Sequence, residues 1–166
     1  MELNSKKNLT KLTMELLWWV ITIIVIVLTI QPIWPNFAVK DFLYELVLFQ
    51  LIFITYTRYL FALKNTFLAD AQKLKVLLIF LSLPLAFYLI QMFFNYQDFL
   101  DKQNEGMQEF DQFFVEGISF DTHNNTIQYL TKVYLFFGLS AIISVIVSPF
   151  RLLLSYWRVF NNTGTV

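Results

Sequence analysis

Residues 76–96 read VLLIFLSLPLAFYLIQMFFNY and contain no charged side chain. A helix of about 20 predominantly apolar residues is long enough to cross the hydrocarbon core of a bilayer. This stretch has that length and is rich in Leu, Ile and Phe. It therefore predicts a transmembrane helix.

Three other stretches have a similar length and composition, and they lie at residues 16–34, 42–63 and 127–150. The first of them follows several lysines, as the apolar part of a signal peptide does. No small-x-small cleavage site comes after it, so we expect it to be retained. The sequence therefore predicts an all-α membrane protein, a bundle of four transmembrane helices in a single domain, residues 1–166.

The overall composition agrees with a membrane location. Hydrophobic residues make up 57% of the chain and charged residues 14%, with nineteen Phe. Soluble domains contain about 45–50% apolar and about 25% charged residues, and so small a globule could not bury this excess. We expect an integral, multi-pass protein of the cell membrane or an inner membrane, with the lipid bilayer as its solvent. The formal net charge is zero, so the chain has no global basic field that would favour nucleic acid.

The connections between the apolar stretches differ in their Lys and Arg content, which sets the orientation of a membrane protein. One side of the membrane holds nine basic residues from the two tails and the second connection: Lys6, Lys7, Lys11, Arg58, Lys64, Lys73, Lys75, Arg151 and Arg158. The other side holds Lys40 and Lys102, with Lys132 just inside the fourth stretch. Because the basic side faces the cytoplasm, we expect both termini to form short cytoplasmic tails.

The longest segment outside the apolar stretches is the extracytoplasmic loop expected at residues 97–126. It is acidic, with seven Asp and Glu residues against one Lys. On a helical wheel, residues 105–118 place an apolar face opposite an acidic one, which predicts an amphipathic helix in this loop. The apolar face contains Met107, Phe110, Phe114 and Ile118.

Three polar residues fall at a similar depth within the predicted membrane helices. Glu45, Gln91 and Lys132 each lie about one turn, or slightly more, inside the outer end of a different helix. Ionisable side chains within a membrane are costly and mark candidate sites. One interpretation is an ion pair between Glu45 and Lys132 with Gln91 beside it. The other is that each side chain extends separately toward the headgroups.

A row of small residues follows the fourth predicted helix. Ser140, Ser144 and Ser148 recur at every fourth position, and Gly138 lies nearby. Small residues at this spacing let another helix approach closely. The row is a helix-packing face either within one chain or between copies of an oligomer.

The sequence lacks the residue patterns of common enzymes. It contains no Cys and a single His, His123, and it has no phosphate-binding loop, Gly-x-Ser-x-Gly or His-Glu-x-x-His motif. We therefore expect neither an enzyme nor a bound metal or cofactor.

The expected function is that of a small non-enzymatic polytopic membrane protein. It would act as an accessory, immunity or sensor subunit through helix–helix and outer-loop contacts, as a homo-oligomer or as part of a membrane complex. The alternative is a small oligomeric channel or transporter. A pore needs a continuous polar stripe, whereas these helices offer mostly isolated polar residues.

Overall fold

The computed structural model describes residues 2–104 and 113–161, and within them the side chains of residues 9–100 and 113–161. Its elements, in chain order, are α1 (Glu2–Ile30), the 3-10 turn η1 (Trp34–Asn36), α2 (Asp41–Ala62), the 3-10 turns η2 (Leu63–Asn65) and η3 (Phe67–Ala69), α3 (Gln72–Asn104) and α4 (Phe120–Phe160). Each of the four α-helices is long and apolar enough to cross a membrane. The predicted all-helical membrane architecture is confirmed at this level.

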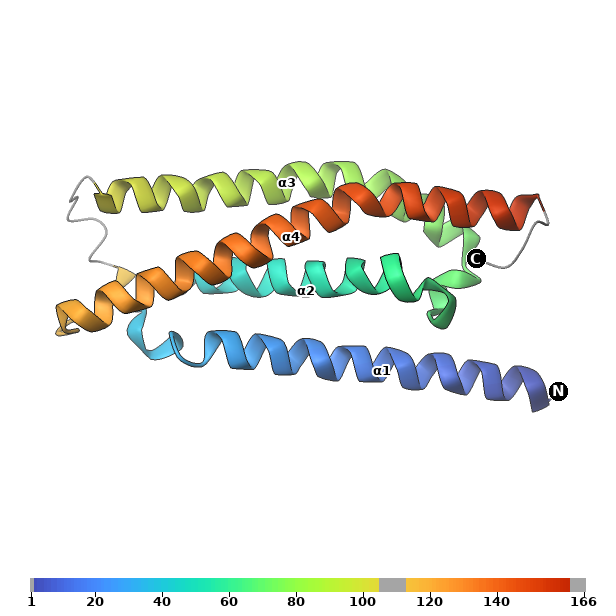
Figure 1. Ribbon diagram of the computed structural model, residues 1–166, viewed down its shortest axis with the longest axis horizontal. Helices are drawn as coiled ribbons and strands as arrows, with labels where there is room; N and C mark the ends of the chain where they lie inside the picture. The colour runs from blue at the N-terminus through green and yellow to red at the C-terminus, as the bar shows by residue number, and fades with distance from the viewer. Residues whose placement is uncertain (1, 105–112, 162–166) are drawn as a thin grey trace.

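The four helices run in alternating directions along one axis (Figure 1). The start of α1, the α2–α3 connection and the end of α4 lie at the same end of the bundle. We call this the basic end, because the nine basic residues named above belong to it. The α1–α2 connection, the end of α3 and the start of α4 lie at the other end, which we call the loop end.

Polar and apolar side chains are distributed as in a protein that lipid surrounds. Large apolar side chains such as Ile23, Phe80 and Ile143 are exposed on the outward faces of the helices, whereas polar ones such as Gln50, Lys75 and Ser148 are buried between them. A soluble domain has the opposite pattern. The structure is therefore consistent with a multi-pass membrane protein.

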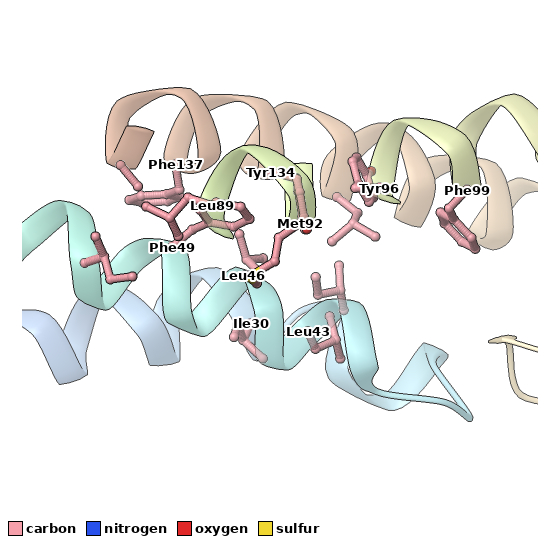
Figure 2. Packing of buried hydrophobic residues seen from close by; sticks show 14 of the residues in the cluster. Ile30, Leu43, Leu46, Phe49, Leu89, Met92, Tyr96, Phe99, Tyr134 and Phe137 are labelled. Carbon is pink, nitrogen blue, oxygen red and sulfur yellow. The ribbon is translucent and has the colours of Figure 1, made fainter. Parts of the chain in front are cut away.

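The core forms where α4 packs along both α2 and α3. Figure 2 shows Leu46 and Phe49 of α2 pointing toward Leu89 of α3 and toward Tyr134 and Phe137 of α4. Leu46, Phe49, Leu89 and Tyr134 have no exposed surface. Helix α2 and helix α3 touch each other far less than either touches α4. Helix α4 is therefore the central element of the bundle.

Helix α1 lies at the periphery and contacts mainly α2 (Figure 1). Only 11% of its apolar membrane window is buried in the bundle, against 44% for α2 and 39% for α4. The burial of the window in α3 is intermediate, at 22%. Helix α1 is thus attached to the other three helices along one narrow face.

The loop end differs from the sequence-based prediction. Helix α3 runs to Asn104 and α4 begins at Phe120, so both helices extend into the loop expected at residues 97–126. The side-chain oxygen of Ser119 caps α4 by accepting a hydrogen bond from the backbone N–H of Thr122. These helices continue beyond the apolar stretches. The backbone hydrogen bonds of a helix also form in polar sequence, whereas a prediction from hydropathy ends where the apolar residues end.

Residues 113–118 were expected to belong to an amphipathic helix, but they are not α-helical. Phe114 forms an isolated antiparallel bridge with Phe37, and their rings lie 4.6 Å apart. Gly117 follows with a φ of +83°, a conformation that ends a helix. Phe114 is buried against the α1–α2 connection, and Ile118 is half-buried beside the core. Met107 and Phe110 lie outside the described residues.

Candidate intramembrane polar sites

The first polar site joins α2 to α4 in the half of the bundle nearer the loop end. The hydroxyl group of Tyr134 donates a hydrogen bond to Oε2 of Glu45 at 2.6 Å. The ring of Tyr96, from α3, stacks on the ring of Tyr134 with centroids 3.8 Å apart and an interplanar angle of 19°. The hydroxyl groups of Tyr96 and Thr131 are also hydrogen-bonded, at 3.0 Å. Three helices thus meet around one half-buried carboxyl group.

The structure does not bring Glu45, Gln91 and Lys132 together. Gln91 and Lys132 are exposed on the outside of the bundle. Within the described part of the chain, the ion pairs are Lys11–Asp70 and Glu15–Arg58. Lys132 and Tyr134 are two residues apart on α4, which separates them by about 200° around the helix. Because Tyr134 faces the core, Lys132 faces outward.

The second polar contact lies between α1 and α2. The amide Nε2 of Gln50, a fully buried residue, donates a hydrogen bond to the hydroxyl oxygen of Thr29 at 2.7 Å. The hydroxyl group of Tyr129 donates to the backbone carbonyl of Thr29 at 3.2 Å. Thr29 therefore fastens the end of α1 to both α2 and α4. One signal in the sequence could have indicated this contact, which is the amide side chain of Gln50 within a predicted transmembrane helix.

The third polar site fastens the other part of α1 at the basic end. Nη1 of Arg58 lies 2.5 Å from Oε2 of Glu15, and both side chains are largely buried. One turn before Glu15, the buried ammonium group of Lys11 pairs with Asp70, which is exposed at the α2–α3 connection. The basic residues among them were expected only to mark the cytoplasmic side. Their pairing depends on the rotation of α1 about its axis, which composition does not reveal.

Lys75 lies in the same region and has no exposed surface. Its ammonium group donates hydrogen bonds to the backbone carbonyl of Ala69 at 2.7 Å and to the hydroxyl oxygen of Ser155 at 2.9 Å. Lys75 thus links the α2–α3 connection to the last part of α4. Together with Lys11 and Arg58, it forms a set of three buried cations at the basic end.

The row of small residues on α4 faces helices of the same chain. A Cβ atom added to Gly138 would lie 2.8 Å from Cδ2 of Phe93 on α3. The hydroxyl groups of Ser148 and of Ser82, on α3, lie 3.4 Å apart. Ser144 is buried and donates to the carbonyl of Ala141, whereas Ser140 is only half-buried. Gly138 and Ser148 therefore allow α3 and α4 to approach closely, which is the intramolecular alternative for this row.

These three sites share one physical role, because each joins helices through a hydrogen bond or an ion pair inside an apolar surrounding. Such contacts fix the rotation and register of membrane helices.

Comparison with models of protein families, with curated proteins and with solved structures gives no match to this chain.

Proposed function

We propose that this protein is a non-enzymatic accessory subunit of a membrane complex, and that it binds a transmembrane partner through the outward face of α1. The observation that carries this proposal is the shallow attachment of α1, of whose membrane window only 11% is buried. Polar contacts at Glu15 and Thr29 hold the helix at a fixed position beside α2. Most of its surface is left for contacts outside the chain.

The residues on this surface suit helix–helix packing. Residues 20–27 read VITIIVIV, and every one of them is β-branched. In a helix, β-branched side chains keep essentially one χ1 rotamer, so they lose little conformational freedom when another surface packs on them. Val20, Ile23 and Val27 are exposed at a spacing that places them on one face. This face is a rigid, ridged surface, which is what packing-driven association in lipid requires.

The interior of the bundle gives less support to the alternative of a channel. In the half of the bundle nearer the loop end, Leu46, Phe49 and Leu89 fill the space between α2, α3 and α4 without exposed surface (Figure 2). A conducting path needs polar groups or water along its length. The outward faces of α3 and α4 are mostly apolar, as Phe80 and Ile143 illustrate.

Photo-crosslinking in the native host membrane tests the partner proposal. A benzophenone amino acid replaces Ile23 on α1, and a matched control replaces Ile143 on α4, which is similarly exposed at 60% against 58%. We expect a discrete adduct with a different protein from position 23 and lipid adducts only from position 143. An adduct of twice the chain mass of 19.7 kDa, the same protein adduct at both positions, or lipid adducts alone at position 23 contradict the proposal.

A further inference from the structure

A cavity of about 200 Å³ lies between α1 and α2 on the side of the basic end. Its apolar wall includes Leu17, Trp18 and Ile21 of α1. Arg58, Asn65 and Thr66 line it from α2 and the α2–α3 connection. Glu15 of α1 lines it as well. The exposed wall of the cavity is almost entirely apolar, so the polar residues contribute mainly carbon atoms to it.

The size of the cavity restricts what it can hold. Pockets that enclose a whole small molecule have volumes of about 300–1,000 Å³, and this cavity is smaller. It is also partly bounded by the outer surface of the transmembrane helices, where lipid surrounds the protein. An occupant that inserts one apolar segment and keeps the rest outside fits these conditions, as an acyl chain of a lipid does.

Arg58 lies at the end of the cavity nearer the basic end, where Glu15 balances its charge and its Nε atom is buried. The residue is only 6% exposed. Its Nη1 atom pairs with Glu15 at 2.5 Å and its Nη2 atom donates to the hydroxyl oxygen of Tyr59 at 3.1 Å. Its Nε atom has no hydrogen-bond partner among the described residues. A guanidinium group has five N–H donors in a planar fork, a geometry that matches phosphate.

The charge around the cavity has the same sign over a wider area. The basic end contains nine basic residues against three acidic ones, Glu2, Glu15 and Asp70. Lys64 is exposed immediately before Asn65, which lines the cavity. Basic pockets between transmembrane helices on the cytoplasmic side attract anionic headgroups. Charge complementarity therefore favours an anionic lipid over a zwitterionic one.

We propose that this cavity is a binding site for an anionic glycerophospholipid. Its phosphate group lies at Arg58, Asn65 and Lys64, and one acyl chain runs along Leu17, Trp18 and Ile21. The bound lipid spans the gap between α1 and α2 and strengthens the attachment of α1. This proposal is independent of the protein partner, because it concerns the inward side of α1 rather than its outward face.

Tryptophan fluorescence provides the test, because Trp18 lines the cavity. The other three tryptophans, Trp19, Trp34 and Trp157, are replaced by Phe. The protein is reconstituted in phosphatidylcholine vesicles that contain increasing fractions of phosphatidylglycerol with brominated acyl chains, which quench a neighbouring indole. We expect saturable quenching at a mole fraction well below that needed with brominated phosphatidylcholine. Identical curves for the two lipids overturn the proposal.

Two variants separate the headgroup contact from the acyl-chain contact. Lys64→Gln removes one exposed cation beside the cavity and disturbs no buried pair, and we expect about a fivefold weaker preference for the anionic lipid. Ala62→Phe places a ring in the cavity and keeps every charge, and we expect it to abolish saturable quenching. Thermal stability in detergent identifies any variant that has failed to fold.

A matched control distinguishes a site from general attraction to the basic end. Arg151 lies at the same end, is half-buried, and donates a hydrogen bond to the carbonyl of Leu60 without lining the cavity. We expect Arg151→Gln to keep the wild-type preference. An equal loss in Arg151→Gln and in Lys64→Gln overturns the proposal. Competition by water-soluble glycerol phosphate also overturns it, because the site would then bind phosphate without an acyl chain.

Discussion

The hydroxyl oxygen of Tyr134 lies 2.6 Å from Oε2 of Glu45, and this hydrogen bond connects α4 to α2 inside the bundle. Tyr134 has no exposed surface, and the ring of Tyr96 covers its face. A carboxyl group at this depth is costly without a partner. The Tyr134 hydroxyl provides that partner, so Glu45 is retained by a neutral donor rather than by a cation.

Replacing Tyr134 with Phe removes the donor and keeps the stacked ring. We expect the free energy of unfolding to fall by about 1–2 kcal/mol, since hydrogen bonds between membrane helices contribute up to about 1.7 kcal/mol and an unpaired buried acceptor adds a penalty. Thermal unfolding in detergent measures the change. Tyr88→Phe is the control, because Tyr88 is exposed on α3. Equal effects of the two substitutions would mean that the hydrogen bond contributes nothing.

A pair of double-mutant cycles identifies the residue that is energetically coupled to Glu45. Glu45→Gln is combined with Tyr134→Phe in one cycle and with Lys132→Met in the other. We expect a coupling above about 0.5 kcal/mol in the first cycle and a value within about 0.3–0.5 kcal/mol of zero in the second, which is the scatter for independent sites. A large coupling to Lys132 would restore the ion pair considered from the sequence.

The two ion pairs at the basic end differ in burial, so they should differ in their contribution to stability. Glu15 and Arg58 have side chains that are 17% and 7% exposed, whereas the side chain of Asp70 is 65% exposed. We expect Glu15→Ala to destabilise the protein by about 3–5 kcal/mol, because it leaves a buried guanidinium group unpaired. Asp70→Ala should cost less, about 1–3 kcal/mol, because Asp70 itself is solvated, although the Lys11 side chain that it leaves unpaired is only 4% exposed. Chemical or thermal unfolding that ranks the two variants in the opposite order contradicts this prediction.

Gly138 has no room for a side chain. The Cβ atom of an alanine would lie 2.8 Å from the ring of Phe93, so Gly138→Ala should cost about 1–3 kcal/mol through overpacking. Phe93→Leu in the same protein should recover part of this loss. Ser140→Ala, in the same row but half-buried, serves as the control in the same unfolding assay. Failure of Phe93→Leu to rescue would place the strain elsewhere.

The orientation predicted from the basic residues is open to a labelling experiment, because the chain contains no cysteine. Lys64→Cys lies at the basic end and Glu116→Cys at the loop end, and both positions are exposed. A membrane-impermeant thiol reagent applied to intact cells should label position 116 and reach position 64 only after permeabilisation. Labelling of position 64 in intact cells reverses the topology.

The sequence predicted the four helices well, because a transmembrane helix depends on length and hydropathy, which one stretch such as residues 76–96 contains by itself. It predicted the partners of the polar residues poorly. Glu45 was recognised as a site, but its partner is Tyr134 rather than Lys132. A pairing across helices depends on how each helix is rotated, and residues at equal depth can face opposite directions. Burial of Lys75 and Arg58 was missed for the same reason.

The loop end shows a second limit of the sequence pattern. The helical wheel of residues 105–118 placed Phe114 on an apolar face, and Phe114 is buried in the structure. It did not predict that Phe114 meets Phe37 in an extended bridge. The contact joins two segments more than seventy positions apart, so the pattern of residues within either segment cannot predict it. The positive φ of Gly117 could have been suspected from the glycine alone.

The central position of α4 has a consequence for biosynthesis. Because α2 and α3 pack chiefly on α4 and little on each other, the ribosome completes three helices before the element that unites them exists. Glu45 meets Tyr134, and Lys75 meets Ser155, only after these residues of α4 have been translated. Until then Glu45 lacks this hydrogen-bond donor, and a carboxyl group at its depth is costly in lipid. Ribosome stalling or premature termination before residue 130 would therefore yield helices that insert but remain targets for membrane proteases.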